Sequence, residues 1–145
     1  MEQRIDMYQS EPKAYQGMFA LEDYLNNSPL SKKQISLIKM RASQLNGCGY
    51  CINMHMNEAL KANETQQRLH LLNAWSESGL FSKEEKAILA MTEEITMIAE
   101  KGLSEATYQE ALTFFDEKTI IAIIMAITTI NAWNRIAIST RMGVQ

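Results

Sequence analysis

The amino-acid sequence predicts an all-α protein, a helical bundle of about six to seven helices. Its 145 residues include only two prolines and six glycines, the residues that punctuate the short strands of β-rich proteins. Ala, Leu, Glu, Lys, Gln and Met, which favour helices, are abundant instead. Because one hydrophobic core serves about 100–200 residues, we expect a single domain over residues 1–145.

Charge and hydropathy exclude several kinds of partner. The net charge is −3 and neither sign gathers in a run, whereas binding to nucleic acid needs a basic face. The first ten residues are polar and include Glu2 and Asp6, so we expect no signal peptide. No apolar run approaches the roughly 20 residues of a membrane span. We therefore expect a cytoplasmic protein without a nucleic-acid or membrane partner.

Three helices are predicted in the first half of the chain. The first covers residues 12–25, where Pro12 suits the first turn and apolar residues recur at helical spacing. The second begins after Ser31, a favourable N-cap, and ends at Asn46-Gly47. The third runs from Cys48 to about residue 62, which places both cysteines at its start.

Four more helices are predicted in the second half. They cover residues 64–75, residues 83–100 after the N-cap Ser82, residues 104–115, and residues 117–139. The last helix is apolar on most of its surface and must be buried all round. In a chain this small, it is either the central element or covered by another subunit, so we expect a homo-oligomer.

Cys48, Cys51 and His55 are the candidate catalytic residues. Positions three and four apart share a helix face, so the three side chains line one stripe. The unpaired amides of a helix N-terminus favour the thiolate, and a nearby imidazole can accept or return a proton. Two thiols at this spacing can also close into a disulfide, so a sulfenic acid formed on one is resolved by the other. The pattern predicts dithiol redox chemistry.

Coincidence and zinc binding stay open as alternatives for the cysteine pair. Free cysteine is among the most buried residue types, so two could fall three apart by chance. Zinc would need more ligands, but the only other histidine is His70 and no further cysteine exists. Attachment of c-type haem is excluded, because Ile52 stands where that site needs a histidine. No metal or organic cofactor is expected.

Five further residues favour a structural role over a functional one. His70 lies among leucines and is expected to be packed. Trp75, Trp133 and Tyr50 could wall an apolar pocket, but aromatic residues at helical spacing usually belong to a core or an interface. Arg135 follows in an apolar helix, so its guanidinium should have a carboxylate or carbonyl partner.

Residues 41–55, with the sequence RASQLNGCGYCINMH, resemble the core of the alkylhydroperoxidase AhpD-like proteins of the carboxymuconolactone decarboxylase family. Residues 64–75, 80–82 and 131–135 are similar to the short single-domain members, so the resemblance covers roughly residues 12–140. The shared pattern joins CxxC, the trailing histidine and a preceding Ser-Gln-x-Asn-Gly in order.

The resemblance implies a trimeric or hexameric helical protein that reduces hydroperoxides and is itself reduced by an external dithiol. It gives Cys51 the role of the attacking thiolate, which becomes sulfenic acid, and Cys48 the role of the thiol that resolves it. Helix-terminus physics alone would favour Cys48 as the more acidic thiol. His55 is expected to manage the protons.

The sequence departs from the family pattern at Ser36. The family's proton relay usually begins with a glutamate at this position, and a hydroxyl cannot act as a base at neutral pH. His55 or a carboxylate from another helix would have to substitute. Ser36 therefore keeps open a non-enzymatic alternative, in which the CxxC pair senses redox state or holds zinc. A decarboxylase of the carboxymuconolactone type is more remote, because members with that activity generally lack the cysteine pair.

Overall fold

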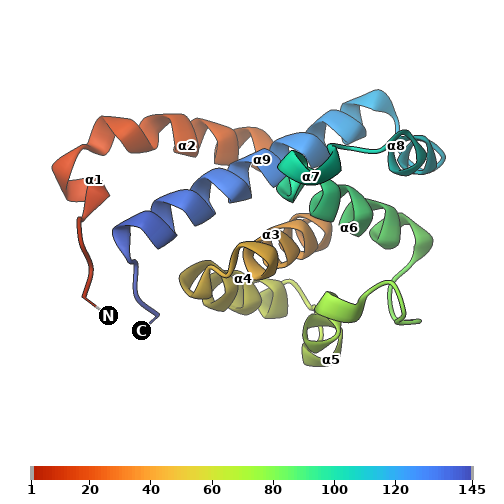
Figure 1. Ribbon diagram of the computed structural model, residues 1–145, viewed down its shortest axis with the longest axis horizontal. Helices are drawn as coiled ribbons and strands as arrows, with labels where there is room; N and C mark the ends of the chain where they lie inside the picture. The colour runs from red at the N-terminus through yellow and green to blue at the C-terminus, as the bar shows by residue number, and fades with distance from the viewer. Residues whose placement is uncertain (1, 145) are drawn as a thin grey trace.

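The computed structural model describes residues 2–144, and within this range the regular secondary structure is all helical (Figure 1). It contains nine α-helices, of which six have seven or more residues, and no strand among the described residues. The prediction of an all-α fold is confirmed, and the helix count is higher than expected because the single turns α1 and α7 form separate helices. In chain order, the elements are α1 (Met7–Ser10), α2 (Pro12–Asn26), α3 (Lys32–Asn46), α4 (Gly49–Lys61), α5 (Gln66–His70), the 3₁₀ turn η1 (Leu72–Ala74), α6 (Lys83–Thr96), α7 (Ile98–Lys101), α8 (Glu105–Leu112) and α9 (Glu117–Thr140).

Helix α3 lies at the centre of the packing and contacts α4, α6 and α9. Figure 1 shows α9 running along the length of the molecule, with α2 beside it on one side and α3 and α6 on the other. The main core contains aliphatic residues of α3, α6 and α9, together with both cysteines. The start of α4 is therefore part of the core and not a surface loop.

Helix α9 is a central element, and within a single chain it is buried over only part of its surface. Residues such as Ile123 and Ile127 are fully buried, whereas Ile121 is 54% exposed and Ile138 is 47% exposed. By length and composition α9 could span a membrane, yet half of its most apolar stretch is buried against the protein. Part of α9 is therefore exposed in a single chain. A partner subunit that covers this part remains a prediction.

The helix predicted over residues 64–75 is broken in the structure, and this prediction was wrong. The α-helical part ends at His70 and a 3₁₀ turn follows. Leu69 and Leu72 lie on either side of this change and are buried in the same core cluster. The segment therefore keeps both leucines in the core across the break.

The helix predicted over residues 83–100 also ends earlier, at Thr96, followed by the separate turn α7. The carboxylate of Glu94 accepts hydrogen bonds from the backbone N–H and the hydroxyl of Ser104, at 2.7 and 3.0 Å. This contact keeps Ser104 next to α6. A helix that continued straight through residue 100 would carry Ser104 away from Glu94. The next helix, α8, ends at Leu112 and not near residue 115.

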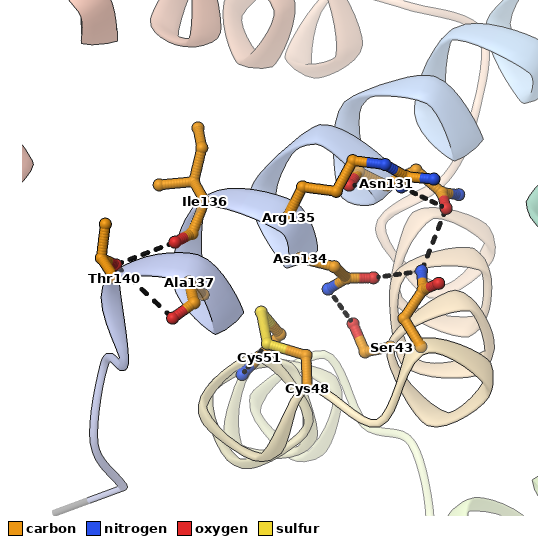
Figure 2. Close-up of a disulfide and its surroundings, with 10 residues drawn as sticks. Ser43, Cys48, Cys51, Asn131, Asn134, Arg135, Ile136, Ala137 and Thr140 are labelled. Carbon is orange, nitrogen blue, oxygen red and sulfur yellow. Dashed lines mark hydrogen bonds between the residues drawn. A yellow bond between two sulfur atoms is a disulfide. The ribbon is translucent and has the colours of Figure 1, made fainter. Parts of the chain in front are cut away.

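A buried polar link joins the end of α3 to α9, as Figure 2 shows for Asn134 and Ser43. Asn134 is fully buried, and its Nδ2 donates to Ser43 Oγ at 3.0 Å. Its Oδ1 accepts from Asn46 Nδ2 at 2.9 Å, and the same nitrogen donates to Asn131 Oδ1 at 3.0 Å. Because buried polar groups need partners, this link favours one alignment of α3 on α9.

We expect Asn134→Ala to lower the free energy of unfolding by about 1–3 kcal/mol, because Ser43 and Asn46 would lose buried partners. Asn73→Ala is the matched control, since Asn73 is exposed and lies away from this contact; a surface change of this kind should stay within about 0.5 kcal/mol. Urea unfolding measures both. Equal stability of the two variants would contradict a structural role for the link.

Candidate active site

The turn between α3 and α4 positions both cysteines. Gly47 adopts a left-handed conformation with φ 68°, which ends α3 and is readily adopted by glycine. Cys48 follows as the N-cap of α4, and its Sγ accepts a hydrogen bond from the Cys51 N–H at 3.4 Å. The predicted place of the cysteines, at the start of a helix, is thus confirmed.

The two sulfurs form a disulfide packed beneath α9, beside Asn134 and Ala137 (Figure 2). The Cα atoms of Cys48 and Cys51 are 5.3 Å apart. Cys48 is 1% exposed and Cys51 is 2% exposed. The pair is therefore capable of a dithiol–disulfide cycle, but a reactant reaches it only through the interior.

Such a path exists on the side of Cys51. A cavity of about 270 Å³ is lined by residues of α2, α3, α4 and the end of α9, and it includes Cys51 but not Cys48. It adjoins a larger hollow of about 790 Å³ beneath the N-terminal segment, which shares several lining residues with it. The apolar wall of the cavity consists of four aromatic residues and two methionines: Tyr15, Phe19, Tyr50, Trp133, Met54 and Met142.

His55 lies in the same cavity and pairs with Glu58 on the next turn of α4. The Nδ1 and Oε2 atoms are 2.7 Å apart, and since a carboxylate only accepts, the proton sits on Nδ1. His55 is buried, and among the described residues its Nε2 has no hydrogen-bond partner. Glu58 thus orients the ring and leaves Nε2 as the nitrogen free to exchange a proton.

The pairing with His55 also changes the pKa of the Glu58 carboxyl group. The hydrogen bond from His55 lowers the pKa of Glu58 below its ordinary value of 4.5, and the positive charges of His55, Lys39 and Lys61 act in the same direction. Partial burial opposes this shift but does not reverse it. Glu58 therefore remains ionised beside His55 at neutral pH.

A second charged pair borders the cavity from α2 and α3. Lys39 Nζ donates to both carboxylate oxygens of Glu22, at 2.8 and 2.7 Å. The Trp133 indole nitrogen of α9 donates to Glu22 Oε1 at 2.9 Å. Lys39 is 7% exposed, whereas the Glu22 side chain is 26% exposed, so a buried ammonium group meets a partly exposed carboxylate.

Ser36 does not line the cavity of Cys51. It is buried beside an outer groove between α2, α3 and α4, which it shares with Glu22, Lys39 and Glu58. Glu22 and Glu58 line both this groove and the cavity of Cys51. Two carboxylates thus lie between the groove and the cavity, although position 36 itself has none. Among the described residues, the group that donates a hydrogen bond to the Cys48 sulfur is the Cys51 amide and not a carboxyl group.

The remaining residues singled out in the sequence are divided between site and scaffold. Trp133 and Tyr50 line the cavity, whereas the Trp75 indole donates to Glu93 Oε1 at 2.6 Å, away from it. His70 is exposed, so the prediction that it is packed was wrong. Arg135 donates to the Asn131 carbonyl oxygen at 2.9 Å, the kind of partner that was expected.

Glu22, Lys39 and Glu58 are site residues that the sequence reasoning did not identify. Glu58 follows His55 by three residues on one helix, so helical spacing could have found it. Lys39 interrupts the apolar run around Leu37 and Ile38, which is a signal that a buried charge needs a partner. Glu22 has no comparable local signal.

The described part of the chain, residues 2–144, contains no cluster of three or more His, Cys, Asp or Glu side chains placed to hold a metal ion.

Fold and site together define an all-helical protein with a CxxC pair at a helix N-terminus beside a buried histidine. Comparison with known proteins identifies the family of this chain. Residues 12–94 match the model of the carboxymuconolactone decarboxylase family. The uncharacterized protein YdfG of Bacillus subtilis (strain 168) is 39% identical over 139 residues, which cover 96% of this chain and 95% of YdfG.

Solved structures share the fold. A protein of unknown function from Agrobacterium tumefaciens, with a proposed role as the antioxidant defence protein AhpD, has a TM-score of 0.96 and 35% identity over 99% of both chains. The debrominase Bmp8 has a TM-score of 0.84 and 17% identity over 94% of this chain and 74% of its own, a likeness in fold alone. This chain belongs to the carboxymuconolactone decarboxylase family, as an AhpD-like member.

We expect Glu58→Gln to lose stability relative to the parent at neutral pH, with the difference shrinking as the pH falls below about 4.5. The folded-state pKa of Glu58 lies below its unfolded value, so its stabilising effect is present above the unfolded pKa and lost as pH falls through the folded one. Thermal unfolding from about pH 3 to pH 7 measures this difference.

Glu77→Gln is the control for that experiment, because Glu77 is exposed. It should follow the parent at every pH. A stability difference for Glu58→Gln that is the same at low and neutral pH would contradict the ionic pairing with His55.

Proposed function

We propose that this protein is a thiol-dependent peroxidase that reduces hydroperoxides through a dithiol–disulfide cycle of Cys48 and Cys51. The observation that carries the proposal is the cavity in which Cys51 lies with His55, whose Nε2 has no partner among the described residues. Cys48 lies outside that cavity. A hydroperoxide that enters from the N-terminal hollow meets the Cys51 sulfur first, next to an acid–base group.

In the reduced protein, His55 Nε2 accepts the proton of the Cys51 thiol. The thiolate then attacks the terminal oxygen of the hydroperoxide, the O–O bond breaks, and a sulfenic acid forms on Cys51. The departing alkoxide takes the proton from Nε2 and leaves as the alcohol. Glu58 stabilises the imidazolium between these two transfers through the hydrogen bond to Nδ1.

Cys48 completes the oxidation. Its thiolate attacks the Cys51 sulfur, the S–O bond breaks, and the hydroxide takes up a proton and leaves as water. The product is the Cys48–Cys51 disulfide present in the structure. An external dithiol then returns two electrons and two protons by thiol–disulfide exchange.

Turnover of tert-butyl hydroperoxide with dithiothreitol as the reductant tests the proposal. We expect Cys51→Ser to abolish turnover, because no thiol would then face the cavity. We expect His55→Gln to slow it by roughly 100- to 10,000-fold, the usual contribution of a general acid–base group.

Glu77→Gln, an exposed change remote from the cavity, should retain the parental rate. Parental activity in Cys51→Ser would refute the proposed reaction. Loss of two thiols to peroxide without repeated turnover would instead identify a redox sensor.

A further inference from the structure

The Lys39–Glu22 pair has no part in the reaction described above, yet it borders the cavity that contains Cys51. The ammonium group is buried, and its carboxylate partner is held in turn by the Trp133 indole. Burying a lysine is costly unless it is paired, and Glu22 supplies that pairing. The pair places a fixed positive charge on the wall of the cavity that contains Cys51.

We propose that Lys39 is an electrostatic positioning residue, which favours the thiolate form of Cys51, and that Glu22 fixes its place and limits its effect. The inference rests on the proposed function in treating Cys51 as the reactive thiol. Nothing passes from Lys39 to the substrate. Its role is to supply charge next to a sulfur that must become an anion.

The charges around the cavity explain why a cation is needed there. Glu22 and Glu58 contribute two negative charges on the cavity wall, and both disfavour a thiolate. Burial raises the pKa of Tyr15, so this phenol stays neutral. Lys39 is then the permanent cation of the cavity, whereas His55 is charged only when Nε2 carries a proton in addition to Nδ1. The titratable and charged groups that line the cavity with Cys51 are Tyr15 and Glu22 from α2, Lys39 from α3, and Tyr50, His55 and Glu58 from α4; α9 contributes only the uncharged Trp133 and Ala137.

Lys39 on α3 lies close enough to α4 for its charge to act on a side chain of that helix. Its positive charge is one of the causes that lower the pKa of Glu58, on the neighbouring helix α4. Cys51 is on that same helix and lines the same cavity. A charge that favours the ionised form of Glu58 acts in the same direction on an ionised Cys51 sulfur.

The two members of the pair are predicted to have opposite effects. Lys39→Met removes a positive charge and leaves the carboxylates unopposed, so the thiol should ionise at higher pH. Glu22→Gln removes a negative charge and keeps a hydrogen-bond acceptor for Lys39, so the thiol should ionise at lower pH. A role in stability alone would not produce opposite shifts.

The test uses the full-length chain with Cys48→Ser, so that Cys51 is the only thiol. A serine hydroxyl at an N-cap can accept the amide hydrogen bond that the Cys48 sulfur accepts now. The rate of alkylation by iodoacetamide, measured against pH, gives the midpoint of Cys51 ionisation. We expect Lys39→Met to raise this midpoint by about half to one unit and Glu22→Gln to lower it by a similar amount. Lys39→Arg should keep it near the parental value.

The chain contains a matched control pair. Glu93 accepts hydrogen bonds from Arg41 Nε at 2.7 Å and from the Trp75 indole at 2.6 Å, the same arrangement as Glu22 with Lys39 and Trp133, but away from the cavity. Glu93→Gln should affect stability as Glu22→Gln does and leave the ionisation midpoint unchanged.

An unchanged midpoint in Lys39→Met, or shifts of the same sign in Lys39→Met and Glu22→Gln, would overturn the proposal. If Lys39→Met does not fold, Glu22→Gln alone decides: a lowered midpoint supports the proposal, and an unchanged or raised one overturns it. The titration needs no peroxide. Its outcome is therefore independent of peroxide turnover in the parent protein, which tests the proposed function itself.

Discussion

The reversal of the chain at Gly47 is the constraint on which the site depends. The left-handed backbone at this residue ends α3, and Cys48 begins α4 directly afterwards. Helix α4 consequently starts inside the core, beneath α9, with both sulfurs buried and the next turns of the helix facing a cavity. A longer loop would allow the cysteines to lie at the surface. The short turn instead gives the two sulfurs different surroundings: Cys48 caps the helix, and Cys51 faces the cavity with His55.

The sequence could predict the fold class and those helix ends that depend on local chemistry. Ser31 caps α3 and Gly47 ends it, as expected, because capping and left-handed backbone are preferences of single residues. Helix ends that depend on distant contacts could not be predicted in this way. The helix that stops at Thr96 does so where the chain is held back by a bond between Glu94 and Ser104, ten residues apart.

The same distinction applies to the site. Cys48, Cys51 and His55 lie within eight residues of one helix, so their shared face follows from helical spacing. Lys39 and Glu22 come from different helices, 17 residues apart, and the indole that completes their cluster is far away on α9. No local pattern predicts such an assembly. The position of Ser36 raised the question of which group replaces a carboxylate, and only the arrangement of α2, α3 and α4 around the cavity and the outer groove could supply candidates.

The central claim is that Cys51, and not Cys48, meets the oxidant. The most direct measurement treats the Cys48→Ser and Cys51→Ser proteins with one equivalent of tert-butyl hydroperoxide in the presence of dimedone, and identifies the labelled peptide by mass spectrometry. Dimedone reacts with sulfenic acid and therefore records which sulfur was oxidised. The account predicts a label on Cys51 in Cys48→Ser, and an unmodified Cys48 thiol in Cys51→Ser. Labelling of Cys48 at a rate equal to or greater than that of Cys51 would contradict it.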